Sequence, residues 1–176
     1  GVDYLTRIAA AARDRGSRIC FAIVGGGSQE QFVRDEAERL GVLNKNLFMY
    51  PPMPKQEMPH VLAAADIALS LFADFRPMWA NSANKFFDAL ASGTPVAINY
   101  GGWQAELLRE YGAGTVLPPD DPNEAACCLD TLVADRKGLS EAGRMARTLA
   151  EERFNRDKLA EDLESELLSA VSGSRG

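Results

Sequence analysis

Histidine and cysteine are scarce in this sequence, which has one histidine, His60, and three cysteines, Cys20, Cys127 and Cys128. A structural zinc site takes about four such ligands at short spacings, and these residues do not offer that pattern. The sequence therefore predicts no metal site, and His60 is expected to help pack a short helix. An odd, sparse set of cysteines excludes a disulfide framework and is typical of reduced thiols in a cytoplasmic protein.

An excess of positive charge and long apolar runs are also absent. The 19 basic and 25 acidic side chains give a net charge of −6, which excludes nucleic acid as the main partner because phosphate-backbone binders need a cationic face. No apolar run approaches the roughly 20 residues of a membrane-spanning helix. The chain also lacks the Gly-Lys-Ser/Thr of a phosphate-binding P-loop and the Gly-x-Ser-x-Gly of a nucleophile elbow.

Strand-like and helix-like segments alternate along the 176 residues. The predicted strands are short apolar runs at Ile19–Val24, Leu47–Tyr50, Ile67–Leu71, Pro95–Ile98 and Gly114–Leu117. The predicted helices have apolar residues at helical spacing and occupy 3–15, 28–40, a stretch ending near 65, 84–91, 103–111, 123–134, 137–151 and 157–171. This alternation predicts a Rossmann-like α/β domain over residues 1–171, with a doubly wound parallel sheet covered by helices on both faces. Residues 172–176 read as a tail.

Ligands of such folds bind outside the carboxyl ends of the strands, where the glycine turn Gly25–Gly27 lies between a predicted strand and a helix expected to start at Ser28. Glycines let a backbone approach a ligand closely, and the following helix N-terminus favours an anion. Glu30 occupies the third position after Gly27, so the turn is not a Gly-x-Gly-x-x-Gly fingerprint. A tight turn without a ligand is the alternative interpretation.

The segment from Asn81 to Val96 is the most informative stretch. Polar residues and Lys85 precede a short helix, which ends at Ser-Gly before the strand at Pro95–Ile98. The helix places Asn84 and Asp88 on one face, with Lys85 about 100° away. A helix N-terminus, a cation and a carboxylate together suit a ligand with phosphates and sugar hydroxyls. The alternative is that Asp88 is a surface acid, or pairs with Lys85.

The loop at 72–83 carries Asp74, Arg76, Trp79 and Asn81, a composition that suits a lid over a site or a domain-packing surface. Glu106, in the first turn of the following helix, is expected to interact with the helix dipole rather than to serve as a catalytic acid.

Five segments, taken together and in order, resemble the C-terminal nucleotide-sugar-binding domain of GT-B glycosyltransferases of glycosyltransferase family 4. They are Ile23–Gly27, Leu40–Leu47, Tyr50–Glu57, Leu62–Ile67 and Asp88–Val96, the last being similar to the family's Glu-Ala-Met-Ala-x-Gly-x-Pro-Val signature. The resemblance covers nearly the whole chain. It implies that the family's first strand and an N-terminal acceptor-binding domain precede this sequence, so that the chain is part of a larger protein.

The resemblance also implies a role for each matching residue. Asp88, usually Glu in the family, would bind the ribose hydroxyls, and the backbone at Met53 would meet the edge of the base. The turn of Gly25, Gly26 and Gly27 would lie against the nucleotide phosphates. Ser82, Asn84 and Lys85 would face the diphosphate and the donor sugar. The resemblance assigns no catalytic residue to this chain and implies no cofactor and no metal.

One departure concerns the family's first acid, whose position is Ala80 here. The run Ser82-Ala-Asn-Lys-Phe-Phe-Asp88 instead resembles a branch of bacterial surface-polysaccharide transferases that use UDP-linked amino sugars. Lys85, a flexible point charge suited to phosphate, would replace part of the diphosphate contact in that branch.

The resemblance implies a retaining, metal-independent glycosyltransferase that uses a nucleotide-diphosphate sugar, with UDP the expected nucleotide, in bacterial polysaccharide or lipopolysaccharide synthesis. The acceptor would be a glycan or a lipid-linked glycan. The expected location is the cytoplasm, or the inner face of the membrane by way of the preceding domain. Two alternatives stay open: a GT-B-fold UDP-sugar epimerase, and a nucleotide-binding module without activity.

Overall fold

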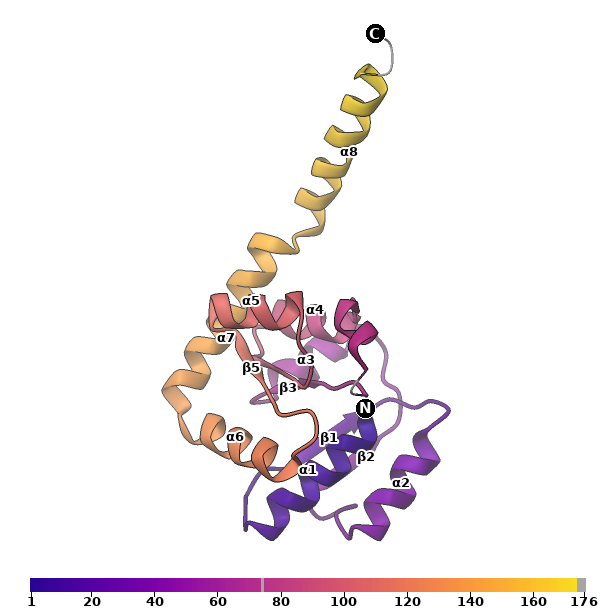
Figure 1. Ribbon diagram of the computed structural model, residues 1–176, viewed down its shortest axis with the longest axis vertical. Coiled ribbons are helices and arrows are strands. Elements are labelled where there is room, and N and C mark those ends of the chain that lie inside the picture. The colour runs from indigo at the N-terminus through magenta and orange to yellow at the C-terminus, as the bar shows by residue number, and fades with distance from the viewer. Residues whose placement is uncertain (74, 174–176) are drawn as a thin grey trace.

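The computed structural model describes residues 1–73 and 75–173 and shows an α/β body from which one long helix projects (Figure 1). The strands are β1 (Phe21–Val24), β2 (Leu47–Tyr50), β3 (Ala68–Ser70), β4 (Val96–Ile98) and β5 (Gly114–Val116). The helices are α1 (Val2–Asp14), α2 (Glu30–Arg39), α3 (Met58–Ala63), α4 (Asn84–Ala91), α5 (Trp103–Tyr111), α6 (Pro122–Ala134), α7 (Arg136–Arg153) and α8 (Arg156–Gly173), with a 3₁₀ helix η1 (Arg76–Ala80). The predicted alternation of strand and helix is confirmed.

All strand pairs are parallel, as predicted, but the strands form two sheets rather than one continuous sheet. β1 pairs with β2, and β3, β4 and β5 pair in that order. Within the described residues, β1 has β2 as its only neighbouring strand, and β3 has β4 as its only neighbouring strand. One edge of β1 and one edge of β3 therefore have no ladder partner in the part of the chain that the structure describes.

Helix α1 joins the two sheets through a common core. Its apolar face, which includes the fully buried Ile8, packs in one cluster with Phe21 of β1, Leu47 of β2 and Ala97 of β4. Burial of a side chain such as Ile8 contributes about 1.5–3 kcal/mol to folding. A second cluster packs α4, α5 and α7 around Phe86. The apolar periodicity used to predict α1, α4, α5 and α7 thus corresponds to core faces.

Several predicted boundaries shift for local reasons. α2 begins at Glu30 rather than at Ser28, because a turn in which the Glu30 amide donates to the Gly27 carbonyl precedes it. β1 begins at Phe21 rather than at Ile19, whose amide donates to the Ser17 hydroxyl instead of joining the ladder. The helix predicted at 157–171 is α8, which spans Arg156–Gly173 and so takes in the first two residues of the predicted tail. Residues 174–176 lie outside the described part of the chain.

Helix α8 extends away from the body, toward the end marked C in Figure 1. Four of its leucines, at positions 159, 163, 167 and 168, have relative solvent exposures of 50–62%. In the part of the chain that the structure describes, no helix is both long enough and apolar enough to span a bilayer.

Tyr4 holds α1 to the segment after β5 and is expected to make the stability of the fold depend on pH. Its hydroxyl donates to the Pro118 carbonyl at 2.6 Å, and burial, with a smaller contribution from the nearby Asp121, raises the pKa of Tyr4 to about 12. The unfolded chain therefore loses this proton first as the pH rises from 10 to 12. We expect the free energy of unfolding to fall by up to about 3 kcal/mol across that interval. Urea denaturation at each pH measures the free energy of unfolding. The Tyr4→Phe variant should lack the decrease that comes from Tyr4. If the free energy of unfolding changed with pH in the same way in both proteins, the assignment to Tyr4 would be contradicted.

Candidate functional site

The glycine turn and the loop after β2 are neighbours because their strands pair. The Gly25 amide donates to the Tyr50 carbonyl at 3.1 Å, and Gly25 has a φ of +134° that strongly favours glycine. A Cβ on Gly26 would lie 3.6 Å from Cγ of Pro52. Met53, half-buried, follows in the same loop. Gly25–Gly27 and Met53 therefore lie on one side of the carboxyl edge, as the sequence predicted.

Helix α4 begins at the carboxyl side of β3. Its N-cap residue is Ala83, which offers no capping side chain. The Asn81 side-chain oxygen accepts instead from the Ala83 amide at 3.2 Å. Ser82 and Asn84 are exposed at this helix start, where the helix dipole and uncapped amides favour an anion.

Lys85 lies at the same helix start, above the two residues that follow β3, Leu71 and Phe72, which form a platform beneath it. Its Nζ is 4.5 Å from the centre of the Phe72 ring and donates to the Leu71 carbonyl at 3.4 Å. The side chain is exposed at its surface, yet the surrounding chain desolvates the ammonium group enough to lower the pKa of Lys85. Among the described residues, no carboxylate lies within 4.0 Å of Lys85 Nζ. The predicted alternative of an ion pair with Asp88 is therefore wrong.

Asp88 lies one turn further along α4 and opens onto a pocket of about 520 Å³ between α3 and α4. Lys55 and Arg147 supply cations to this pocket, and His60 lines it as well. The expectation that His60 helps pack a short helix is wrong, because its side chain is exposed and α3 buries none of its residues. The pocket thus combines the half-buried carboxylate of Asp88 with the cation of Lys55, while Arg147 is paired with Glu151. Its lining residues are Lys55, Met58, Pro59, His60, Ala63, Asp88, Ala91, Ser92 and Arg147.

Sequence reasoning missed the polar residues beneath this site. Asn99 exchanges two hydrogen bonds with the backbone of Phe72. The buried hydroxyls of Ser70 and Tyr100 lie 3.1 Å apart, and Tyr100 donates to Gln104. The signal available in the sequence was a pair of polar or amphipathic residues, Asn99 and Tyr100, directly after an apolar strand.

The loop between β3 and α4 packs on its own domain through Trp79. A Cβ on Gly101 would lie 2.7 Å from the Trp79 ring, and one on Gly102 would lie 2.8 Å from the Trp79 carbonyl oxygen. Arg76 lies over the same indole, 5.4 Å from its centre. Asp74, which the sequence placed in this loop, lies outside the described residues. Glu106 occupies the first turn of α5, as predicted.

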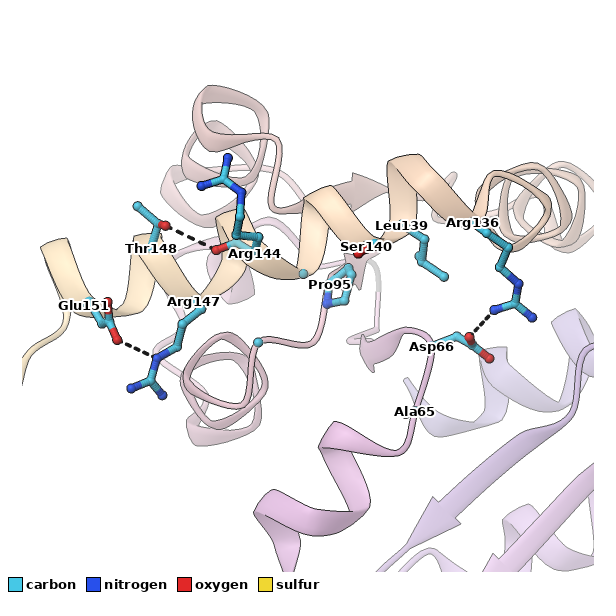
Figure 2. A pocket seen from close by; sticks show the side chains of 12 residues that line it. Ala65, Asp66, Pro95, Arg136, Leu139, Ser140, Arg144, Arg147, Thr148 and Glu151 are labelled. Carbon is cyan, nitrogen blue, oxygen red and sulfur yellow. Dashed lines mark hydrogen bonds and ion pairs between the residues drawn. The ribbon is translucent and has the colours of Figure 1, made fainter.

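A second pocket, of about 730 Å³, lies beside the segments that lead into β3 and β4 and shares Arg147 with the pocket beside Asp88. Figure 2 shows Arg136 directed at Asp66 and Arg147 at Glu151, and Arg144 pairs with Glu141. Its arginines are therefore already matched by acids. None of the residues predicted for a ligand lines this pocket.

The three cysteines are free, as predicted. Across residues 1–73 and 75–173, no group of three or more His, Cys, Asp or Glu side chains is arranged to hold a metal ion. The groups available for ligand chemistry at the carboxyl edge are thus a helix N-terminus, the cation of Lys85 and the carboxylate of Asp88.

Comparisons with known proteins agree on the fold. HepE from Anabaena, crystallised with UDP and glucose, matches with a TM-score of 0.72 at 20% identity, over 90% of this chain and 44% of HepE. Sucrose-phosphate synthase from Thermosynechococcus elongatus matches with a TM-score of 0.78 at 16% identity, over 98% of this chain and 43% of the synthase. The chain therefore spans less than half the length of these two proteins.

A third match is a C-terminal domain solved by itself. This domain of LpcC, a glycosyl transferase group 1 family protein from Francisella tularensis, has a TM-score of 0.71 at 16% identity, over 89% of this chain and 80% of that domain. These likenesses confirm the predicted Rossmann-like fold. A search of curated proteins found no match. The model of the family of glycosyl transferases group 1 matches residues 1–149, and the chain belongs to that family.

Proposed function

We propose that this chain is the donor-binding, C-terminal domain of a retaining, metal-independent glycosyltransferase of family 4 that takes a UDP-sugar. The observation that carries the proposal is the pair of charged groups that α4 presents. Lys85 is a cation without an acidic partner among the described residues, and Asp88 is a carboxylate that lines a pocket. A nucleotide-diphosphate sugar has the complementary groups, since its phosphates attract the cation and its ribose hydroxyls donate to the carboxylate.

The remaining predicted residues have places in this proposal. Asp88 binds the ribose, and Lys55 lies in the same pocket. The backbone at Met53 meets the base, and Gly25–Gly27 lies beside that loop. Ser82 and Asn84, exposed where α4 begins, contact the diphosphate and the sugar. That HepE was crystallised with UDP-glucose supports a UDP-linked donor for this chain.

The contribution of this domain to the reaction is electrostatic. Negative charge grows on the diphosphate as the sugar leaves, and groups already aimed at that charge lower the barrier. The N-terminus of α4 and Lys85 are such groups. A nearby diphosphate also favours the charged form of Lys85, opposing the desolvation that lowers its pKa. The acceptor, a glycan or lipid-linked glycan of a bacterial surface polysaccharide, would bind a preceding domain.

One edge of β1 and one edge of β3 lack a ladder partner among the described residues, which supports the proposed larger protein. We propose that a further parallel strand, preceding α1 in the full-length protein, pairs with both edges and joins the two sheets. Strands buried on both faces read as continuous apolar runs. Ile23, Val24 and Leu69 belong to such runs but are only half-buried here.

Ala80 favours a second candidate function. It stands at the end of η1, exposed, where the family resemblance expects an acid. A nucleotide-binding module without transferase activity fits that substitution. Turnover of a UDP-sugar by the full-length protein would exclude such an inactive module. The epimerase alternative gains no support from the site, because His60 is the sequence's only histidine.

Lys85→Ala tests the phosphate assignment, with titration calorimetry as the measurement. We expect the variant to bind UDP about ten- to a hundredfold more weakly, because a charge-assisted hydrogen bond contributes about 1.5–3 kcal/mol. Uridine, which lacks phosphates, should bind the variant and the wild type alike. Lys137→Ala, at an exposed lysine of α7, is the matched control and should leave both affinities unchanged. Equal losses for UDP and uridine would contradict the assignment.

A further inference from the structure

The Asn99 side chain links the chain segments that follow β3 and β4 through two hydrogen bonds. The last register pair of β3 and β4 is Ser70 with Ile98. Beyond it, the Phe72 amide donates to Oδ1 of Asn99 at 2.9 Å, and Nδ2 of Asn99 donates to the Phe72 carbonyl at 2.8 Å. Asn99 is 3% exposed. Because a side-chain amide has the donor and acceptor of a peptide, Asn99 fixes both backbone groups of Phe72 where the ladder has ended.

The residue that Asn99 fixes is the one on which Lys85 rests. The Phe72 ring lies 4.5 Å beneath Nζ of Lys85, and the preceding carbonyl, of Leu71, accepts from Nζ. The edge of Tyr100 supports the same ring, with centroids 5.2 Å apart at an angle of 75°. The direction in which Lys85 presents its charge therefore depends on the position of Phe72.

A second set of buried groups holds the chain at the start of α4. The Tyr100 hydroxyl lies 3.1 Å from the Ser70 hydroxyl and donates to Gln104, whose Nε2 donates to the Asn81 carbonyl at 3.4 Å. Burial raises the pKa of Tyr100, so the phenol stays a donor at a higher pH than an exposed tyrosine would. Ser70, Tyr100 and Gln104 are each at most 4% exposed. The network therefore anchors the helix start while Asn99 anchors the platform.

We infer that Asn99 is the positioning residue that aims Lys85 at the diphosphate of the nucleotide. The inference rests on the proposed function. Asn99 itself is buried and has both of its polar groups engaged by Phe72, so it acts through the ring and not on the ligand. Without Asn99, the Phe72 amide and carbonyl lose their partners, and a buried unpaired polar group moves toward water when it can. The ring then leaves Lys85, and the cation loses its orientation.

Asn99→Ala is the test, made in the 176-residue chain with two measurements. The first is nuclear magnetic resonance of lysine labelled at Cε, in which protons held over a ring face are shifted upfield; Lys85→Ala identifies the signal. The second is calorimetric titration with UDP and with uridine. We expect Asn99→Ala to abolish the upfield shift of Lys85 and to weaken UDP about tenfold, with uridine almost unchanged.

Thr94→Ala is the matched control for a loss of structure alone. Thr94, 2% exposed, donates to the Leu62 carbonyl at 2.8 Å at the other end of β4. It should lose a comparable hydrogen bond yet keep the Lys85 signal and the UDP-to-uridine ratio. Asn99→Asp retains the acceptor for the Phe72 amide but loses the donor to the Phe72 carbonyl, and it should give intermediate values, which keeps the test open if the alanine variant does not fold.

Two results overturn the inference. One is an unchanged Lys85 signal in the folded Asn99 variants, and the other is an equal loss of UDP and uridine. A wild-type chain that binds no UDP would instead overturn the proposed function and, with it, the diphosphate target. The lysine signal would then still show separately whether Asn99 holds the ring beneath Lys85.

Discussion

Replacing Asp88 by alanine is expected to lower the affinity for UDP by about a hundredfold or more, which would abolish measurable binding to a chain that binds UDP weakly. Two ribose hydroxyls donating to one carboxylate make two charge-assisted hydrogen bonds, each contributing about 1.5–3 kcal/mol. Asp88 is half-buried on α4 and has no ion pair among the described residues, so its charge is available to a ligand. Titration calorimetry with UDP measures the loss.

The pattern across ligands separates Asp88 from Lys85. Uridine retains the ribose, so Asp88→Ala should weaken uridine as much as UDP, unlike Lys85→Ala. Asp88→Asn keeps one acceptor and the shape of the side chain and should lose less. Asp66→Ala is the control, since Asp66 is an exposed acid paired with Arg136 in the second pocket. An affinity for UDP that is the same in Asp88→Ala and in the wild type would refute the ribose role.

Gly114→Ala is expected to lower the free energy of unfolding by about 3 kcal/mol or more. Gly114 begins β5 and pairs with Val96 of β4. A Cβ at this position would lie 1.9 Å from the Val96 carbonyl oxygen and 2.8 Å from its carbonyl carbon. These atoms belong to the backbone of a central strand, so no side-chain rotation relieves the overlap, and β4 and β5 must separate. Urea denaturation measures the change.

Gly27→Ala is the matched glycine control for stability. A Cβ on Gly27 meets nothing within 4 Å, and its φ is not positive. Its free energy of unfolding should stay within about 0.5 kcal/mol of the wild type. If the two variants unfold at the same urea concentration, the contact between β4 and β5 is not as tight as the structure shows.

Local signals in the sequence predicted the local structure well. The helix predicted at 123–134 is α6, and the Asp121 carboxylate caps its start by accepting from the amides of Asn123 and Glu124, each at 2.9 Å. The apolar run before Asn99 predicted β4, which is fully buried. Such signals succeed because caps and strand periodicity involve residues within a few positions of one another.

The features that escaped prediction depend on contacts between distant residues. The division into two sheets is set by which strands pair, and an apolar run carries no record of its partner. The platform under Lys85 joins Phe72 to Asn99, which are 27 positions apart. The predicted helix correctly places Lys85 and Asp88 about one turn apart on α4, but whether they pair with each other was a question of side-chain direction. Only the structure gives that direction.

The two sheets also determine how rigid the proposed site is. Gly25–Gly27 and Met53 follow strands of one sheet, whereas Lys85 and Asp88 follow a strand of the other. Within the described residues no ladder of backbone hydrogen bonds spans that boundary, so the width of the site is maintained by the side chains packed around α1. Packed apolar contacts resist sliding less than an aligned hydrogen-bond ladder does, because they are not directional. A nucleotide that touches both halves would therefore act as a mechanical crosslink and stiffen the domain in which it binds.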